Sequence, residues 1–272
     1  MRRGFDIVLV SATAFALAFL LLPILALFLR ISPATLIAQL GSEAALDALW
    51  VTIKTGLIAH VFVLLVGTPA AYFLATRRFR GRTFAISAIE LPLVLPPAVA
   101  GIALLALFGR RGLLGDTLHA AGIDIVFTQV AVILAVAFVS APFYLRAAIA
   151  AFEGVDPQLL DASRTLGAGP ARTFGRVALP LAGGGLGAGS ALAWARGTGE
   201  FGATIIFAGS FQGVTQTLPL AIYAQLDVDR PTAIAIGALL VCLSLAVLLV
   251  ARTLPSWTRF TSMSLTRSGA SA

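Results

Sequence analysis

Arg196 and Glu200 are the two ionisable residues whose spacing could do chemistry in the most apolar surroundings of this sequence. Residues four apart share one face of a helix, so the two side chains can pair. Ionisable groups inside a membrane are costly and are often functional. Two interpretations stay open: a structural ion pair, or part of a path or gate for a charged solute. The residues of the second interpretation are Arg196, Gly199, Glu200, Phe201, Gly202 and Thr204.

Catalytic and metal-binding patterns are not found in the sequence. Ser190 and Ser210 follow glycines, but neither histidine is placed to act as their base, which disfavours an intramembrane hydrolase. His60 is interpreted as a packed, hydrogen-bonded residue. The single cysteine excludes a disulfide framework, and no Cys/His spacing indicates a metal site. No GxxxxGK[ST] pattern is present, so no bound cofactor and no enzymatic activity are predicted for this chain.

The composition is that of a membrane protein. Of 272 residues, 59% are hydrophobic and only 11% are charged, whereas a soluble domain is about a quarter charged. A membrane-spanning helix needs roughly 20 apolar residues, and four charge-free stretches reach that length. Two further stretches carry Glu90 or the Arg196/Glu200 pair. We therefore predict an all-α, polytopic, single-domain protein (1–272) with six transmembrane helices, at about 7–29, 55–76, 84–108, 125–147, 181–207 and 231–251.

Several local features refine these spans. The basic N-terminal stretch has too long an apolar run for a signal peptide, so it is interpreted as a retained first helix. Pro92, Pro96 and Pro97 predict a kink in the third span. Glu90 is expected to pair with an arginine of "RRFRGR" (77–82). The glycine run "GGGLGAG" (183–189) allows close helix approach, either within the chain or to a second copy.

The distribution of arginine and lysine predicts the orientation. With six spans, 13 of the 19 basic residues fall on one side and 5 on the other. Because basic residues concentrate in cytoplasmic loops, both termini and the loop at about 146–180 are predicted to be cytoplasmic. Lipid headgroups account for this basic face, so no nucleic-acid partner is expected. Arg110 and Arg111, at the outer end of the third span, are expected to contact headgroups or to attract an anion or a binding protein. The polar tail, 253–272, is predicted to be disordered.

The cytoplasmic loop at 153–180 is the longest structured polar segment. Asp156 and Pro157 are typical of a helix start, and Gly167 of a helix end. Leu159, Ala162, Ser163 and Leu166 recur at helical spacing, and Gly169-Pro170 start a second helix. So short a helix is marginal in water. It would lie on the membrane surface or in the groove of a soluble partner.

The stretch "DASRTLGAGPARTFGRVALP" resembles the EAA loop of bacterial ABC importer permeases. Asp161, Ala162 and Ser163 stand where that motif has E-A-A, and Gly167 and Leu179-Pro180 match its glycine and its end. Asp for Glu and Ser for Ala are mild departures. In that family the loop docks on the ATP-hydrolysing subunit. The resemblance assigns this role to Asp161, Ala162, Ser163, Gly167, Ala168 and Arg172.

Further segments resemble the molybdate ABC transporter permeases. They are "LPLVLPPAVAGIALLALFGRRGLLG", "GTGEFGATIIFAG" and "TQTLPLAIY". Sulfate/thiosulfate and tungstate permeases are similar relatives and remain alternatives, because the sequence does not separate these oxyanions.

The resemblance implies a type I importer (MetI-like) fold in the bacterial inner membrane. It further implies a homodimer, two cytoplasmic ATP-binding cassette subunits that carry ATP and Mg²⁺, and an extracytoplasmic oxyanion-binding protein. The transporter would alternate between outward-open and inward-open forms. A secondary transporter driven by an ion gradient is the main alternative. It requires an acid at mid-membrane, which Glu200 could supply, and internal repeats, which are not apparent.

Overall fold

The computed structural model describes residues 2–253, and the described part contains helices and no strand. Most of the predicted disordered tail, 254–272, lies outside the described residues. The helices are α1 Arg2–Leu29, α2 Pro33–Leu40, α3 Glu43–Thr76, α4 Arg82–Val94, α5 Pro97–Phe108, α6 Gly115–Ala120, α7 Gln129–Glu153, α8 Pro157–Thr165, α9 Pro170–Thr173, the π-helical turn η1 Phe174–Ala178, α10 Leu179–Thr198, α11 Gly202–Phe207, α12 Leu218–Gln225 and α13 Arg230–Thr253.

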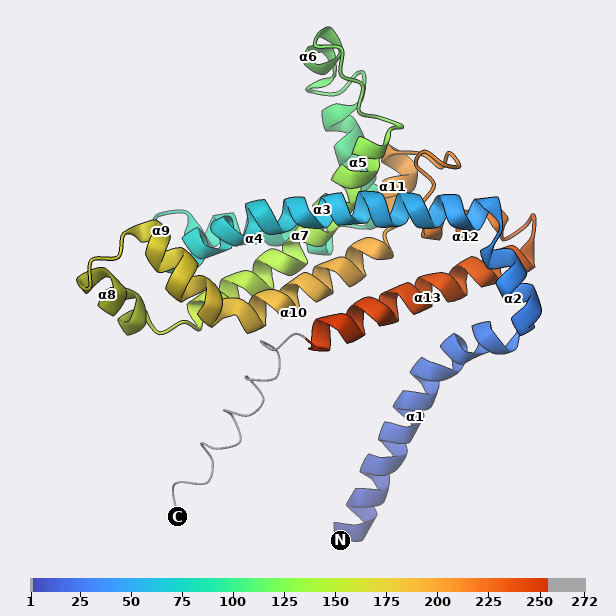
Figure 1. Cartoon of the computed structure of the whole chain (residues 1–272), viewed down its shortest axis with the longest axis horizontal. Coiled ribbons are helices and arrows are strands. Elements are labelled where there is room, and N and C mark those ends of the chain that lie inside the picture. Colours follow the sequence, from blue (N-terminus) through green and yellow to red (C-terminus); the bar gives the residue numbers. More distant parts are fainter. Residues whose placement is uncertain (1, 254–272) are drawn as a thin grey trace.

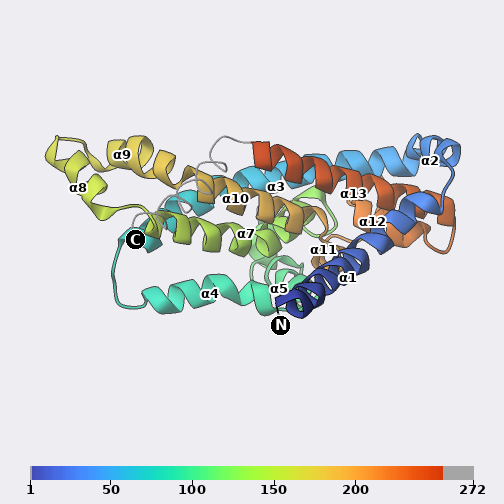
Figure 2. The ribbon, with the colours of Figure 1, turned by 90° about the horizontal axis from the view of Figure 1, so that it is seen from below.

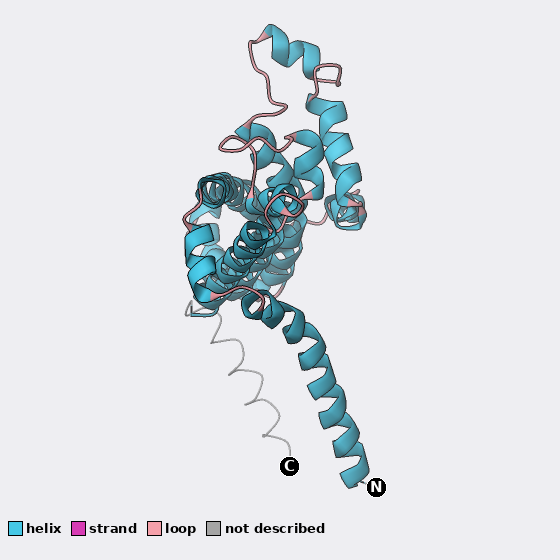
Figure 3. Cartoon of the chain, turned by 90° about the vertical axis from the view of Figure 1, so that its right-hand side faces the viewer, coloured by secondary structure: helices cyan, strands magenta, loops and turns pink. Residues whose placement is uncertain are grey.

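Five helices of the described part are long and apolar enough to cross a membrane, and α4 with α5 forms a sixth if the bent pair is one span. The all-α polytopic fold class is thus confirmed. The long helices α3, α7, α10 and α13 form an elongated bundle (Figure 1). α8 and α9 lie at one end of it, and α2 and α12 lie near the other. α1 diverges from the bundle (Figures 1 and 3), and its residues 5–26 are exposed.

The centre of the bundle is the contact between α10 and its neighbour α7. It depends on glycines that bring the two backbones close together. A Cβ atom at Gly189 would lie 2.6 Å from the Cβ atom of Ala147, and one at Gly185 would lie 2.5 Å from that of Ala151. These two glycines of the 183–189 run therefore serve packing within the chain. His60 donates to or accepts from Ser190 at 2.8 Å on the other side of α10, which confirms its interpretation as a packed, hydrogen-bonded residue.

Substituting Gly189 by valine is expected to push α7 and α10 apart. Overpacking of a tight contact costs about 1–3 kcal/mol, so the purified chain should melt at a lower temperature in detergent. Gly175→Ala is the matched control, because Gly175 is helical and a Cβ atom there would have no neighbour within 4 Å. Equal melting temperatures for the two variants would contradict the close packing described here.

The predicted third span, 84–108, is two helices and not one. α4 and α5 meet at a bend of 115°. The cause is the Pro96-Pro97 pair: the residue before a proline is driven out of the helical region, and Leu95 and Pro96 are both extended, with ψ of 131° and 136°. Pro92, by contrast, is accommodated inside α4. α5 and α6 consequently turn away from the long helices (Figure 1).

The predicted fifth span, 181–207, is also interrupted. α10 ends at Thr198, and the short α11 begins at Gly202 after an irregular segment at 199–201. At its other end, α10 continues α9 and η1, so that one helical run covers Pro170–Thr198. The span is therefore displaced toward the 153–180 loop relative to the prediction, and the Arg196/Glu200 pair lies at its end.

Candidate functional site

α8 is the best-defined element of the 153–180 loop, and both of its ends are formed as the sequence predicts. The Asp156 carboxylate accepts a hydrogen bond from the backbone amide of Gln158 at 2.9 Å, and Pro157 occupies the first turn. Gly167 has a φ of 84°, and the amide of Ala168 donates to the Ser163 carbonyl at 3.1 Å. A left-handed glycine satisfies the last carbonyls of a helix in this way. The helix is thus stabilised locally, before any partner binds.

α8 has one anchored edge and one free edge. Leu160 is buried and packs against the core of the bundle. Leu159 and Leu166, by contrast, are 48% and 88% exposed. The sequence pattern grouped these two leucines correctly but missed Leu160, because the spacing alone does not say which leucine meets the bundle. Two exposed leucines on a capped helix leave an apolar edge for another molecule.

The side chains of the other loop residues make one contact between α8 and α9 and one ion pair within α8. Ser163 Oγ lies 3.2 Å from Thr173 Oγ1, and Thr173 is fully buried. Arg164 pairs with Asp161 at 2.8 Å. Among the residues assigned to ATPase contact, Asp161, Ala162, Gly167 and Arg172 are exposed, and Ser163 and Ala168 are partly buried. Apart from these two, the candidate contact residues are accessible.

The second candidate cluster lies at the break between α10 and α11. Arg196 Nη1 lies 2.8 Å from Glu200 Oε2, so the two side chains pair as predicted. The Glu200 side chain is 1% exposed, and its other oxygen accepts a hydrogen bond from the Ala203 amide at 2.7 Å. One carboxylate therefore compensates the arginine and caps the start of α11. The break depends on a buried charge that has two partners.

α11 packs closely on α5. A Cβ atom at Gly202 would lie 2.6 Å from Pro97 Cβ, and one at Gly101 would lie 2.9 Å from both the Ala203 carbonyl oxygen and Ile206 Cβ. Contacts this close make α5 and α11 move together. The sequence predicts a kink in this proline-rich segment but does not place Pro97 and Gly101 beside the Arg196–Thr204 cluster.

Other members of this cluster face different neighbours. Phe201 stacks obliquely on Tyr223, with ring centroids 5.4 Å apart. Thr204 is fully buried, and its hydroxyl has no hydrogen-bond partner among the described residues. Gly199 is exposed. The structure thus brings the residues from Arg196 to Thr204 together around one helix break, with polar groups in an apolar setting.

Arg110 and Arg111 lie apart from this cluster. Both are exposed and lie in the loop that follows α5. The first residue of α5, Pro97, is the residue that packs on Gly202. Arg110 lines a cavity of about 370 Å³ together with Leu118, Asp124 and Phe127. The bend before α5 carries this loop sideways out of the bundle (Figure 1). The two arginines follow Phe108, the last residue of the predicted third span, and the bend sets their position relative to the bundle.

The expected partner of Glu90 is also corrected. Glu90 Oε1 lies 3.6 Å from Arg146 Nε on α7, not beside an arginine of 77–82. Arg82, the nearest of those arginines, is two turns away along α4 and pairs with Glu153 instead. Both acids find their partners across the contact of two helices, which the sequence spacing within α4 does not reveal.

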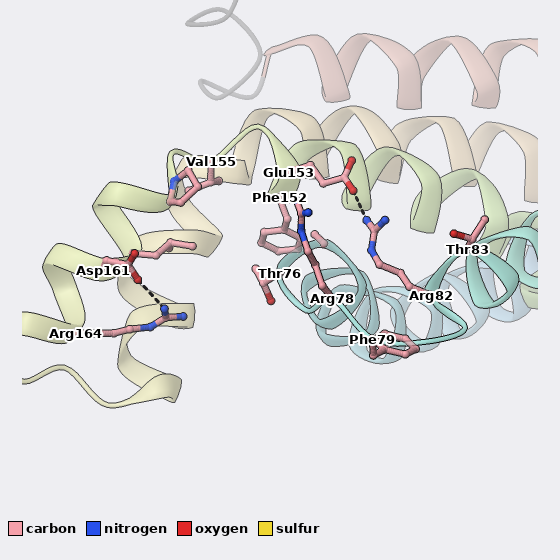
Figure 4. A pocket seen from close by; sticks show the side chains of 13 residues that line it. Thr76, Arg78, Phe79, Arg82, Thr83, Phe152, Glu153, Val155, Asp161 and Arg164 are labelled. Atoms are coloured by element: carbon pink, nitrogen blue, oxygen red, sulfur yellow. Dashed lines mark hydrogen bonds and ion pairs between the residues drawn. The ribbon is translucent and has the colours of Figure 1, made fainter.

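A cavity of about 840 Å³ separates α8 from the turn between α3 and α4 (Figure 4). Arg82 and Glu153 face each other on one side of it, and Asp161 and Arg164 pair on the α8 side. Phe152 contributes to its apolar part. α8 is attached to the bundle through the chain at 154–156, through Leu160 and through the Ser163–Thr173 contact, and a cavity remains open beside it.

The two candidate clusters are far apart but joined by one element. The helical run Pro170–Thr198 leads from the 153–180 loop to Arg196, a length of roughly 40 Å at 1.5 Å per residue. Within the described residues, no group of three His, Cys, Asp or Glu side chains could hold a metal ion.

Comparisons with known proteins agree with this geometry. The family described as "Binding-protein-dependent transport system inner membrane component" matches residues 67–259. The chain is 44% identical over 235 residues to the molybdenum transport system permease protein ModB of Mycobacterium tuberculosis, covering 86% of this chain and 88% of that protein. ModB of Escherichia coli K12 is 39% identical, with 78% and 92% covered. The sulfate transport system permease protein CysT of Salmonella typhimurium is 34% identical, with 93% of each covered.

Solved structures show the same fold. A chain of a bacterial alginate ABC transporter, in complex with an alginate pentasaccharide-bound periplasmic protein, aligns with a TM-score of 0.72 and 16% identity over 91% of this chain and 92% of that one. A chain of the MetNI methionine ABC transporter in an inward-facing conformation aligns with a TM-score of 0.59 and 19% identity, with 76% and 92% covered. At such identities the likeness concerns the fold alone.

Proposed function

Because this chain belongs to the family of binding-protein-dependent transport system inner membrane components, we propose that it is the membrane-spanning subunit of an ATP-driven importer of molybdate. The observation that carries the proposal is 44% identity to a molybdenum transport permease across most of both chains. The matched residues, 67–259, include α8 and the break between α10 and α11. The proposed direction of transport is into the cytoplasm.

In this proposal the energy comes from other subunits. Two cytoplasmic ATPase subunits would bind ATP and Mg²⁺ and receive α8, whose capped ends and exposed leucines suit a groove on a soluble partner. A second copy of this chain would complete the path, and an extracytoplasmic binding protein would deliver the anion. Both termini would lie in the cytoplasm of a bacterial cell, with the chain in its inner membrane.

The break between α10 and α11 would act as the gate. Arg196 offers a positive charge to a dianion, but Glu200 largely neutralises it at 2.8 Å. A conduit requires contacts weak enough to release its cargo, and an arginine whose charge is largely neutralised by a neighbouring carboxylate meets that requirement. α5, packed against α11 through Gly101 and Gly202, would move with it.

Sulfate is the second candidate substrate, because the sulfate permease CysT is 34% identical over 93% of this chain. Sulfate and molybdate are both tetrahedral dianions, so the same path could pass either. The identity to the molybdenum permeases is higher, which favours molybdate.

Uptake by reconstituted vesicles tests the function directly. The chain is reconstituted with its ATPase subunits and its binding protein, and the entry of radiolabelled molybdate is followed with ATP on the ATPase side. We expect uptake to require ATP and both partners, and to be unaffected by excess sulfate. Uptake that continues without the ATPase, or that follows an ion gradient, would contradict the proposal. Competition by sulfate would instead assign the second substrate.

A further inference from the structure

Two ion pairs hold α4 against α7. In one pair α4 supplies the arginine, and in the other it supplies the glutamate. Arg82 of α4 pairs with Glu153 of α7, and Glu90 of α4 pairs with Arg146 of α7 at 3.6 Å. The pairs lie eight residues apart on α4 and seven apart on α7, which is roughly 12 Å and 10 Å of helix. These lengths agree, so both pairs bridge the same helix contact, along which α4 runs beside α7 (Figure 2). Two reversed pairs fix both the register and the direction of α4.

Apolar packing alone holds α4 weakly. None of its residues is fully buried, and only Ala85, Ile86 and Ile89 pack partly against the core. Glu90 lies within a predicted span, where an exposed group faces lipid or protein and not bulk water. An unpaired charge at that depth is costly. The Glu90–Arg146 pair therefore contributes more to the position of α4 than an exposed pair on a soluble protein would.

Arg82 connects three helix ends. Besides its pair with Glu153, its Nε donates to the Leu74 carbonyl at 2.7 Å. Leu74 belongs to the last turn of α3, where carbonyl groups lack partners within the helix. Arg82 itself is the first residue of α4, and Glu153 is the last residue of α7 (Figure 4). The chain then reaches α8 after only three residues, so a displacement of α8 acts directly on Glu153.

The other end of α4 leads to the proposed gate. α4 joins α5 through the proline bend of 115°. α5 and α11 are packed so closely at Gly101 and Gly202 that neither position could hold a side chain without a shift of its neighbours. A movement of α4 together with α7 would therefore displace α5 and, through it, the segment that holds Glu200. This route is separate from the helical run Pro170–Thr198, which joins α9 to Arg196.

We propose that Arg82 and Glu90 are positioning residues that clamp α4 to α7, so that movement of α8 reaches α5 and α11 as a rigid-body displacement. The inference deepens the proposed function and rests on it, because it assumes that an ATPase subunit moves α8. Rigid-body movement of packed helices is a common means of switching between conformations.

Charge exchange at the Glu90–Arg146 pair tests the clamp, since neither side chain makes another hydrogen bond or ion pair within the described residues. The single variants are Glu90→Arg and Arg146→Glu, and the double variant restores the attraction with the charges exchanged. Arg80→Glu is the control for a change of charge, because exposed Arg80 lies in the turn just before α4 and has no ion pair in the described part of the chain. Each variant is assembled with the ATPase subunits and the binding protein in vesicles.

The first readout is ATP hydrolysis with and without the molybdate-loaded binding protein. In each single variant we expect stimulation and molybdate uptake to fall about tenfold, within the range of typical coupling energies. Basal hydrolysis and co-purification of the subunits should stay unchanged. The double variant should recover most of the stimulation, and Arg80→Glu should match the unmodified protein. Unchanged stimulation in the single variants, or a double variant no better than they are, would overturn the proposal.

The second readout does not depend on the substrate. Spin labels at Leu57 of α3 and Ile102 of α5, both more than half exposed, report the distance between these helices when nucleotide binds to the ATPase, in a Cys242→Ser background. We expect a nucleotide-driven change that the single variants abolish and the double variant restores. If the change is present but molybdate does not enter vesicles, the proposed substrate is wrong and the clamp stands. If the single variants keep the change, the clamp is wrong.

Discussion

Replacing Arg196 by methionine is expected to destabilise the chain and to abolish uptake. The substitution leaves the Glu200 carboxylate, 1% exposed, without its ion-pair partner. Removing one partner of a buried pair costs about 3–5 kcal/mol because the remaining charge is uncompensated. Arg196 is itself 29% exposed, so we expect about 3 kcal/mol. Thermal unfolding in detergent measures the loss of stability, and vesicle uptake measures the loss of transport.

A double variant distinguishes the structural role of the pair from its role in transport. Arg196→Met with Glu200→Gln removes both charges, while the Gln carbonyl can still accept the hydrogen bond from the Ala203 amide. A neutral, hydrogen-bonded group is far less costly to bury than a lone carboxylate. Most of the stability should therefore return.

Transport is not expected to return with the stability. If the Arg196 guanidinium attracts the dianion at the gate, uptake by the double variant should stay about tenfold below that of the unmodified protein, which corresponds to the loss of one charge-assisted contact. Recovery of uptake together with stability would show that the pair only supports the fold. The two interpretations that the sequence leaves open are thus separated by one variant.

Local signals in the sequence were sufficient to predict α8. Asp156 and Pro157 at its start and Gly167 at its end act within a few residues, so their effect does not depend on the rest of the fold. The ion pair of Arg196 and Glu200 was predictable for the same reason, because a helix brings residues four apart together. Confirmation of these features by the structure follows from their short range.

Long-range features were not predictable in this way. The partner of Glu90 lies on α7, and no spacing within α4 points to Arg146. The prolines predict a kink, but its size of 115° depends on the packing of α5 against α11. The anchoring of α8 by Leu160, and not by Leu159, likewise depends on the side of the helix that meets the bundle. Each of these features is set by tertiary contacts between elements distant in sequence.

Replacing Gly167 by valine is expected to uncouple ATP hydrolysis from transport while leaving the chain inserted in the membrane. Gly167 has a φ of 84°, and a Cβ atom there would have no neighbour within 4 Å. Steric clashes with neighbouring atoms are thus absent, and the effect is conformational: a side chain in the left-handed region costs about 1–2 kcal/mol, and a β-branched one is least tolerated. The turn between α8 and α9 should open, and the exposed edge of α8 should no longer face its partner.

A graded series at this position makes the prediction specific. Asn tolerates the left-handed region better than other residues do, so Gly167→Asn should keep most of the uptake, Gly167→Ala less, and Gly167→Val about a tenth or below, because a population shift of about 1.4 kcal/mol is tenfold. Gly169→Ala is the control, since Gly169 has a φ of −66° and equally open surroundings. The melting temperature in detergent should fall only slightly, because Gly167 contributes no packing and the turn can open locally to relieve the strain. Uptake that is independent of the residue at 167 would mean that the turn after α8 does not set the geometry of ATPase docking.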